Sequence, residues 1–259
     1  MNKSSISIIV VSYHNIEDIK NLISSIEYHT SANLEKKIII LDNGNTPNKF
    51  KKIVNDYRDV EYINLFKNLG FGRAHNYLLG KIKTKYIALV NPDVIFTEDS
   101  LTIMLDELEK NADDKVLVPK IVSQTGELQH VYRRELTLYD FFVRVFFKND
   151  KHFKKRKKYH TMQDMNYSKS FKIPFAQGSF LLMPTKLFEE LRGFDERFFM
   201  YVEDADFCKR VNQISNVYYT PKTSVIHIWE KGSHNNIKLL KYHVESIVKY
   251  FKKWGWRIK

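Results

Sequence analysis

The chain of 259 residues has 43% hydrophobic residues, one cysteine and a formal net charge of +12, from 42 Lys+Arg against 30 Asp+Glu. This composition excludes global disorder, an intramolecular disulfide and a cysteine-only zinc site, and the length suits one α/β domain with appendages. No apolar run approaches the roughly 20 residues that span a bilayer and no signal peptide is recognisable, so we expect a cytoplasmic protein whose basic excess attracts polyanions.

Strand and helix patterns alternate along the first third of the chain. Continuous β-branched apolar runs are typical of strands buried on both faces, and apolar residues three and four apart are typical of helices. We predict strands at Ser5–Tyr13, Lys37–Leu41, Val60–Leu65 and Tyr86–Val90, with helices between them at Ile16–Tyr28, Pro47–Tyr57 and Phe71–Lys83. This alternation predicts a doubly wound α/β sheet with parallel strands.

The second part of the chain is less regular, and residues 136–172 give no clear pattern. We predict strands at Val116–Val122, Phe175–Met183, Val217–Tyr219 and Ser224–Ile228, and helices at Ser100–Asn111, from Glu203 to about Gln213, and at Ile237–Trp254. The last helix is basic and amphipathic.

Polar residues follow the carboxyl ends of the predicted strands, at the edge where open α/β sheets bind ligands. Asp42 heads an Asp-Asn-Gly sequence, which either contacts a nucleotide or forms a common turn. Asp93 follows a later strand, where its carboxylate either holds a divalent cation or caps the next turn. Gly70 and Gly72 precede a predicted helix, a weak signal for phosphate binding.

An acidic cluster of Glu203, Asp204 and Asp206 opens a predicted helix after an apolar stretch. Three carboxylates there either cap the helix or include a buried general base. His227 lies in a later β-run, as a structural residue or as a metal or phosphate ligand. The loop with Lys231, Ser233 and His234 either touches phosphate or is only solvated.

Six segments, in order, resemble the family 2 glycosyltransferases with the GT-A fold, and most of all the rhamnosyltransferase-type enzymes of O-antigen and capsule synthesis. The segments are SIIVVSYHN, IIILDNGNTP, NLGFGRAHN, ALVNPDV, AQGSFLLMPTKLFEELRGFDERFFMYVEDADFCKRV and VIHIWEKGSH. The resemblance implies a mostly parallel, Rossmann-like sheet flanked by helices. It divides the chain into one GT-A domain at 1–235, with a nucleotide-binding half at 1–95 and an acceptor half at 96–235, and a basic C-terminal helix at 236–259.

The resemblance also implies roles for matched residues. Asp204 stands where the catalytic base usually lies, and Glu203 and Asp206 are expected to position the acceptor or to brace the loop. Asp93 and His227 are expected to hold a divalent cation, Mg²⁺ or Mn²⁺. The donor pocket is expected to include Ser12, Tyr13, Asp42, Asn68, Gly70, Arg73, Asn91 and Asp93. The sequence departs from the family at Asn91-Pro92-Asp93, where one carboxylate replaces the usual acidic pair or triplet, which weakens a strict metal requirement.

The resulting prediction is an inverting glycosyltransferase that moves a sugar, L-rhamnose from dTDP-rhamnose, to a lipid-linked glycan acceptor. The alternatives are a UDP-hexose donor or a non-catalytic glycan- or nucleotide-binding relative. A nucleotidyltransferase would show a Gly-rich phosphate loop where Ser12-Tyr13-His14-Asn15 stands, and no nucleic-acid-binding motif accompanies the charge. The stretches Phe141–Lys158 and Lys249–Trp254 either rest on the inner face of an anionic membrane or are solvated basic surface.

Overall fold

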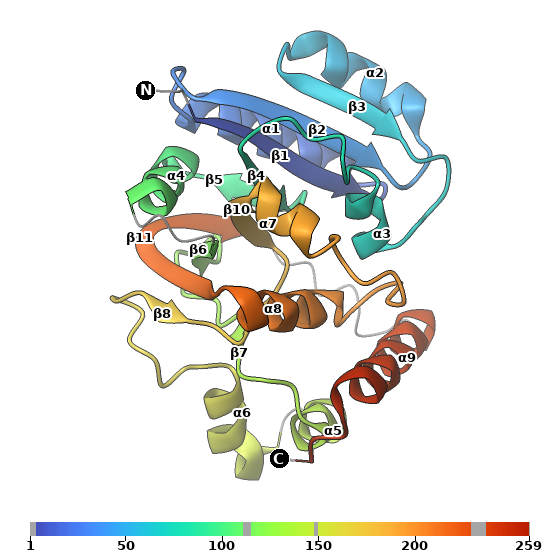
Figure 1. Cartoon of the computed structure of the whole chain (residues 1–259), viewed down its shortest axis with the longest axis vertical. Helices are drawn as coiled ribbons and strands as arrows, with labels where there is room; N and C mark the ends of the chain where they lie inside the picture. Colours follow the sequence, from blue (N-terminus) through green and yellow to red (C-terminus); the bar gives the residue numbers. More distant parts are fainter. Residues whose placement is uncertain (1–3, 111–114, 148–149, 229–236, 259) are drawn as a thin grey trace.

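The apolar runs of the N-terminal half form adjacent strands of one sheet in the computed structural model of the chain, which describes residues 4–110, 115–147, 150–228 and 237–258 (Figure 1). The strands are β1 Ser5–Ser12, β2 Glu35–Asp42, β3 Val60–Asn64, β4 Tyr86–Val90, β5 Val94–Phe96, β6 Val116–Val122, β7 Tyr132–Arg133, β8 Phe171–Lys172, β9 Phe175–Ala176, β10 Phe180–Pro184 and β11 Val217–His227. The helices are α1 Ile16–His29, α2 Pro47–Asp56, α3 Phe71–Asn76, α4 Ser100–Lys110, α5 Leu138–Phe146, α6 Lys154–His160, α7 Thr185–Glu190, α8 Glu203–Ile214 and α9 Ile237–Trp254, with a 3₁₀ turn at Lys151–Phe153.

The central sheet is mixed, and most of its strands run in one direction, as predicted. Its order is β3-β2-β1-β4-β10-β6-β11-β5, with β8 paired to β11. The four N-terminal strands in this order are parallel, but β10 runs antiparallel to both β4 and β6, and β5 and β8 run antiparallel to β11. A strand buried on both faces has the same apolar pattern in either direction, so the sequence does not reveal the reversal.

Two predicted elements differ in extent from the observed ones. The helix predicted over Phe71–Lys83 is regular only to Asn76, and it continues as turns up to Gly80, where φ is +70° and the helix cannot extend. The two short strands predicted after Val217 are one strand, β11, whose pairing with β6 shifts register between Tyr219 and Ser224. The chain on both sides of this irregularity still pairs with β6, as the two apolar runs suggested.

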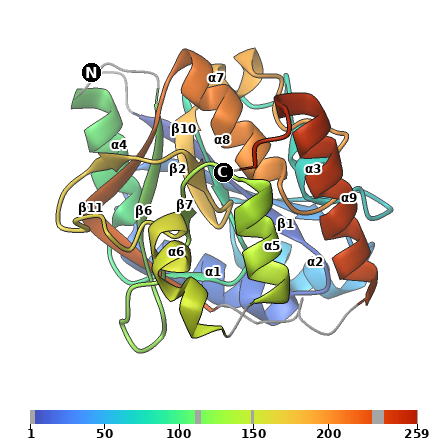
Figure 2. The same cartoon turned by 90° about the horizontal axis from the view of Figure 1, so that it is seen from below.

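The helices α5, α6 and α9 lie together at the end of the molecule opposite α2 and β3 (Figures 1 and 2). Two of them, α5 and α9, belong to a second apolar cluster beside the main core, formed by Leu136, Phe175, Phe198, Val202, Ala205, Ile247, Tyr250 and Phe251. The carbonyls of Arg257 and Ile258 accept hydrogen bonds from the first N–H groups of α5. The stretch that gave no clear sequence pattern therefore forms part of an ordered layer below the sheet.

The end of α9 packs inward, which corrects half of the predicted membrane surface. Phe251 is 1% exposed, and Lys253 and Trp254 bond to carboxylates of the domain. Around α5, by contrast, Phe142 is 48% exposed and Lys154 is exposed beyond it, so that half stays a prediction. In the described ranges, no helix combines the length and the apolar character that crossing a bilayer requires.

Candidate active site

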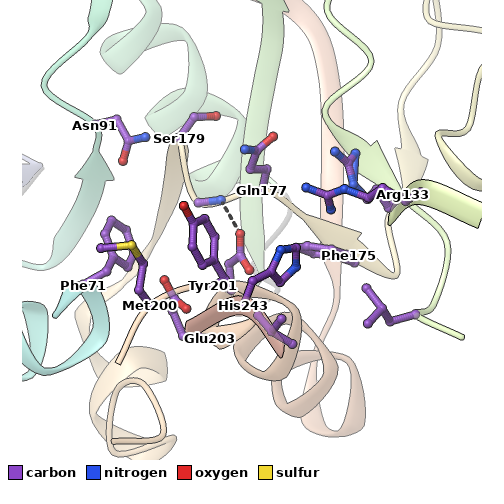
Figure 3. A pocket seen from close by; sticks show the side chains of 15 residues that line it. Phe71, Asn91, Arg133, Phe175, Gln177, Ser179, Met200, Tyr201, Glu203 and His243 are labelled. Atoms are coloured by element: carbon purple, nitrogen blue, oxygen red, sulfur yellow. Dashed lines mark hydrogen bonds between the residues drawn. The ribbon is translucent and has the colours of Figure 1, made fainter. Parts of the chain in front are cut away.

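A cavity of about 300 Å³ opens at the N-terminus of α8, below the carboxyl edge of β4 (Figure 3). It brings together residues from α3, the β4–β5 loop, β7, α5, the β9–β10 loop and α9. The lining residues are Phe71, Asn91, Arg133, Leu136, Arg144, Phe175, Gln177, Gly178, Ser179, Met200, Tyr201, Val202, Glu203, Asp204 and His243. Three predicted site residues, Asn91, Glu203 and Asp204, therefore share one cavity.

Asp204 is held in this cavity by two backbone amides. The N–H of Gly178 donates to Oδ2 at 3.2 Å, and the N–H of Ala205 donates to Oδ1 at 2.9 Å. Burial raises the pKa of Asp204 above its usual 3.8, while the two amides and the positive charge of Arg133 oppose that rise. The result is a carboxylate that is oriented, partly desolvated and still able to ionise, which suits a general base.

Glu203 precedes Asp204 and differs from it in its hydrogen bonding. Its side chain is nearly buried, at 6% relative exposure, and Oε2 is a buried atom without a hydrogen-bond partner. Burial, and then the charge of Asp204, raise the pKa of Glu203 well above 4.5. Because Asp204 accepts from the amides of Gly178 and Ala205 and lies near a guanidinium, whereas Glu203 has a backbone hydrogen bond from its own amide, we assign the negative charge of this pair to Asp204 and the proton to Glu203.

The backbone just before these two acids is strained. Tyr201 and Val202 have φ values of +68° and +69°, a region that side chains, and β-branched ones above all, rarely adopt. Such a conformation costs on the order of 1–3 kcal/mol and persists only where the surroundings impose it. Here the strained pair lines the cavity and leads directly into the first turn of α8.

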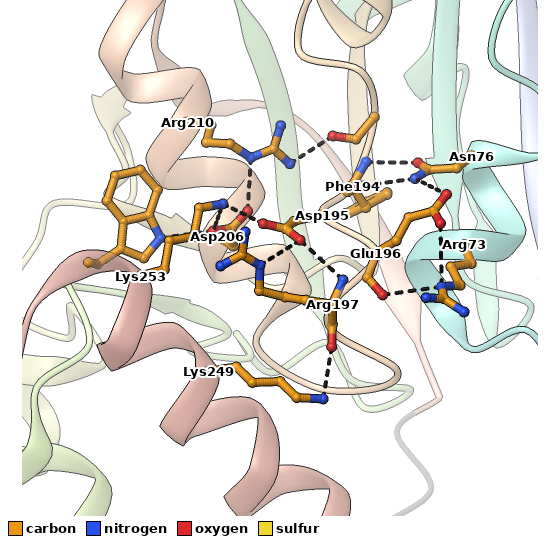
Figure 4. Close-up of polar contacts among 12 residues, drawn as sticks. Arg73, Asn76, Phe194, Asp195, Glu196, Arg197, Asp206, Arg210, Lys249 and Lys253 are labelled. Carbon is orange, nitrogen blue, oxygen red and sulfur yellow. Dashed lines mark hydrogen bonds and ion pairs between the residues drawn. The ribbon is translucent and has the colours of Figure 1, made fainter.

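Asp206 does not line the cavity, and its contacts agree with bracing, one of the two roles predicted for it. It is fully buried, and its carboxylate accepts from Arg210 Nε at 2.8 Å and Trp254 Nε1 at 2.8 Å, and pairs with Lys253 Nζ at 2.6 Å (Figure 4). Lys253 also reaches Asp195 Oδ2 at 2.7 Å. Asp206 therefore anchors α9 to α8 instead of facing a substrate.

At the carboxyl edge of the sheet, Ser12, Asp42 and Asn64 lie in register at the ends of three parallel strands. The carboxylate of Asp42 is fully buried and accepts hydrogen bonds from the N–H groups of Gly44 and Thr46 and from the hydroxyl of Tyr62. These contacts show that Asp42 orders the Asp-Asn-Gly turn, and its direct contact with a nucleotide stays a prediction, because a carboxylate can accept a further hydrogen bond. Ser12 Oγ, by contrast, is buried without a hydrogen-bond partner.

Gly70 is required by packing at the start of α3. Its φ is +82°, and a Cβ there would lie 2.1 Å from the carbonyl oxygen of Phe199. Asn68 accepts a hydrogen bond from the Gly70 N–H at 2.8 Å, and so fixes this turn. Neither residue lines the cavity of Figure 3, and their place in the donor pocket stays a prediction.

Two further residues predicted for the donor pocket lie on the surface. Tyr13 is 53% exposed at the end of β1. Arg73 forms an exposed ion pair with Glu196, 3.5 Å from Nε to Oε2, and donates to the Glu196 carbonyl (Figure 4). Both remain predicted donor contacts, with no support from the cavity itself.

Asp93 and His227 meet at the other side of the sheet edge. His227 Nε2 lies 3.3 Å from Asp93 Oδ2, and Asp93 Oδ1 is buried without a hydrogen-bond partner. Gln129 donates to the carbonyl of His227 at 2.8 Å, so three separate segments converge here. An imidazole and a carboxylate with one orphaned oxygen form a donor set that suits a divalent cation completed by phosphate oxygens and water.

The protein side chains alone supply only part of the ligands that a metal ion needs. Within the described ranges, no group of three or more His, Cys, Asp or Glu side chains is placed to hold an ion. Lys231, Ser233 and His234, predicted phosphate contacts, lie outside the described residues. Asn91, which lines the cavity, stands two residues before Asp93, so the cavity and this edge are adjacent.

Sequence reasoning missed several cavity residues, above all Arg133, Arg144, Gln177 and His243. Arg133 is placed by the pairing of β7 with β9, in which it lies opposite Phe175. Arg144 belongs to the aromatic stretch that was assigned to a membrane surface. The local sequence carries one usable signal, a single arginine within the apolar stretch of α5, and it does not indicate which way Arg144 faces.

Comparisons with known proteins agree with this geometry. The model of the family "Glycosyl transferase family 2" matches residues 7–192. The chain is 26% identical to Rhamnosyltransferase WbbL of Escherichia coli (strain K12) over 255 residues, covering 94% of this chain and 91% of that protein. It is 24% identical to an N-acetylglucosaminyl-diphospho-decaprenol L-rhamnosyltransferase of Mycobacterium tuberculosis over 234 residues, covering 85% of this chain and 75% of that protein.

Solved structures share the fold at low identity. GalNAc-T7 with UDP, GalNAc and Mn²⁺ has a TM-score of 0.69 and 15% identity, and the match covers 91% of this chain and 45% of that one. The mannosyltransferase PcManGT from Pyrobaculum calidifontis, in complex with GDP-Man and Mn²⁺, has a TM-score of 0.66 and 13% identity, and the match covers 98% of this chain and 65% of that one. The chain thus spans less than two thirds of these two structures, and the likeness confirms the predicted GT-A fold.

Proposed function

This chain belongs to glycosyl transferase family 2, and from that premise we propose that it is an inverting glycosyltransferase in which Asp204 is the general base. The observation that carries the proposal is the buried Asp204 carboxylate, beside Arg133 in a cavity that adjoins the Asp93–His227 edge through Asn91. The cavity supplies a base, and the adjoining edge supplies groups for a diphosphate. A transfer from a nucleotide-sugar needs both, next to each other.

In the proposed reaction, Asp204 accepts the proton of an acceptor hydroxyl as that oxygen attacks the anomeric carbon of the donor sugar. The bond from the anomeric carbon to the phosphate oxygen breaks, and the nucleoside diphosphate leaves with the electron pair. General-base help of this kind contributes about 10²–10⁴-fold to the rate. Glu203, kept protonated, adds no second negative charge near the developing diphosphate.

Asp93 and His227 are the residues that would hold a divalent cation, as Mn²⁺ accompanies nucleotides in the two solved structures. When bound, such a cation supplies charge neutralisation for the leaving diphosphate. The chain's own part is to present the orphaned Asp93 Oδ1 and the His227 imidazole at one edge.

The donor is proposed to be a dTDP-linked deoxysugar, L-rhamnose, with a UDP-hexose as the alternative. The names of the two curated relatives support a rhamnosyl donor, and one of them names a lipid-diphosphate acceptor. We propose a lipid-linked glycan acceptor in surface polysaccharide synthesis, reached from the inner face of the membrane. The exposed Phe142 and the lysines of α6 are the surface that supports this position.

A thermal-shift screen against dTDP, UDP, GDP and CDP, each with Mn²⁺, Mg²⁺ or EDTA, tests the proposal. A ligand that binds only the folded protein, at 100 times its Kd, should add roughly 2.7 kcal/mol of stability. We expect one nucleotide to give a clear shift that EDTA removes. A shift that persists in EDTA would overturn the metal, and no shift with any nucleotide would overturn the nucleotide-sugar donor.

A further inference from the structure

Two arginines line the active-site cavity on the side away from Asn91. Arg133 comes from β7 and Arg144 from α5, and Figure 3 shows Arg133 across the cavity from Asn91, with Gln177 between them. Nη1 of Arg133 is buried and has no hydrogen-bond partner. In the part of the chain that the structure describes, neither guanidinium has a carboxylate within ion-pair distance.

The two guanidiniums stay charged although their surroundings oppose it. Burial, and then the charge of Arg144, lower the pKa of Arg133 to about 10. Burial also lowers the pKa of Arg144, although this residue is exposed to solvent. Arginine stays protonated in proteins, so two like charges share a site that is desolvated mainly at Arg133. Such an arrangement is costly unless an anion occupies it.

The acidic residues nearby do not neutralise both arginines. Asp204 faces both arginines, but it carries one negative charge and is held by backbone amides. Asp140, the other carboxylate close to them, is engaged by Arg156 through two contacts of 2.6 Å and by the hydroxyl of Thr137. The two arginines therefore carry one more positive charge than the nearby carboxylates neutralise.

A second cavity, of about 200 Å³, continues from the two arginines. It is lined by Arg133, Asp140, Val143, Arg144, Lys157, His160 and Thr161. Burial lowers the pKa of His160 to about 4, so at neutral pH this ring is uncharged and the basic character comes from arginine and lysine. The second cavity leads toward α6, where Lys154 and Lys155 are exposed. Positive charge thus extends from the proposed base to the surface near α5.

We propose that Arg133 and Arg144 form an acceptor subsite that binds the phosphate or diphosphate group linking the acceptor sugar to its lipid. The subsite deepens the proposed function and rests on it. Planar guanidinium groups match phosphate oxygens in two-point contacts, which a carbohydrate hydroxyl does not require. The donor diphosphate lies on the Asp93–His227 side, so the two phosphate-bearing groups occupy opposite sides of Asp204.

The test uses the full chain saturated with the nucleoside diphosphate that it binds, and geranyl diphosphate as the probe. Geraniol is the matched uncharged probe, and inorganic pyrophosphate separates the diphosphate from its chain. Calorimetry should detect saturable binding of geranyl diphosphate and none of geraniol. Arg144→Gln is the main variant, because Arg133 is more buried and its removal can impair folding. Arg58→Gln, on an exposed loop, is the matched control.

We expect Arg144→Gln to raise the Kd of geranyl diphosphate by roughly 10- to 100-fold, with Arg144→Lys between it and the wild type. The Kd of the nucleoside diphosphate should not change, and Arg58→Gln should change neither. If Arg144→Gln weakens the nucleotide and leaves geranyl diphosphate unchanged, the arginines belong to the donor site and the proposal is overturned. Absence of nucleotide binding by the wild type would instead count against the proposed function, because geranyl diphosphate can be titrated without nucleotide.

Discussion

The acidic residues at the start of α8 have different partners on its two faces. On the cavity face, Glu203 is buried with an unpartnered Oε2, Asp204 is half-buried and held by two amides, and burial raises the pKa of both. On the other face, two residues later, Asp206 accepts contacts from Arg210, Lys253 and Trp254. The first face leaves polar groups available for a substrate, and the second leaves none.

The difference lies in charge pairing: among the described residues, Asp206 pairs with two cations, whereas the proposed base Asp204 accepts from backbone amides. Asp206 is at least as buried as Asp204. Its charge is matched by two cations, and its contacts join α8 to α9, which is a stabilising role. Buried polar atoms without partners cost free energy, and they are retained where a ligand completes them.

The largest expected effect is on the cavity face. Asp204→Asn keeps the side-chain shape but removes the base, so we expect kcat to fall by about 10²–10⁴-fold with the fold intact by circular dichroism. The wild-type rate should also fall as the pH drops through the raised pKa of Asp204, and the variant should lose that limb. An Asn variant that turns over like the wild type would contradict the assignment of the base.

The next effect is on stability, from the outer face. Asp206→Asn leaves Lys253 and Arg210, whose side chains are 19% and 15% exposed, beside a neutral amide, and because both cations keep other partners the cost is at most about 3–5 kcal/mol. We expect this loss in the free energy of unfolding from denaturant titration, with kcat within about tenfold of the wild type where the variant is folded. Full stability combined with a raised acceptor KM would instead return Asp206 to the acceptor site.

The sequence predicts the strands and helices of this region, but it does not predict most of the contacts that distinguish the two faces of α8. The buried β-branched runs predicted β1, β2 and β4, and the amphipathic pattern predicted α9 with the ends that the structure shows. The position of Asp204 at the start of α8 was also predicted. These features depend on local periodicity and on residues that are neighbours in the chain.

What could not be predicted depends on contacts between distant segments. Arg133 enters the cavity because β7 pairs with β9, and Asp206 is satisfied by Lys253 from the far end of the chain. No local pattern encodes either contact. Asp42 shows the same limit, because one short sequence is compatible with a turn and with a nucleotide contact. The hydrogen bond from the Tyr62 hydroxyl, which helps to hold the Asp42 carboxylate, comes from another strand.

A smaller effect is expected from the pH dependence of stability, again on the cavity face. The pKa of Glu203 is raised in the folded protein, so its contribution to stability is complete below the unfolded value near 4.5 and is lost as the pH rises toward the folded value. Glu203→Gln removes this loss. We expect the variant to gain stability relative to the wild type as the pH rises above 4.5, by at most about 1.4 kcal/mol per pH unit. Parallel stability curves for the two proteins would show that Glu203 is ionised in the native state.

The smallest effect is expected at Arg73, whose exposed ion pair with Glu196 adjoins the Asp206 network in Figure 4. Both partners are about half exposed, at 51% and 57%, so water screens the pair and its contribution is roughly 0–1 kcal/mol. Arg73→Gln should therefore change the unfolding free energy little, and a donor KM at the wild-type value would remove Arg73 from the predicted donor pocket. A donor KM that rises several-fold would place Arg73 in the donor pocket, as its sequence position predicted. In that case Glu196 releases Arg73 when the donor binds, and Glu196→Gln should lower the donor KM.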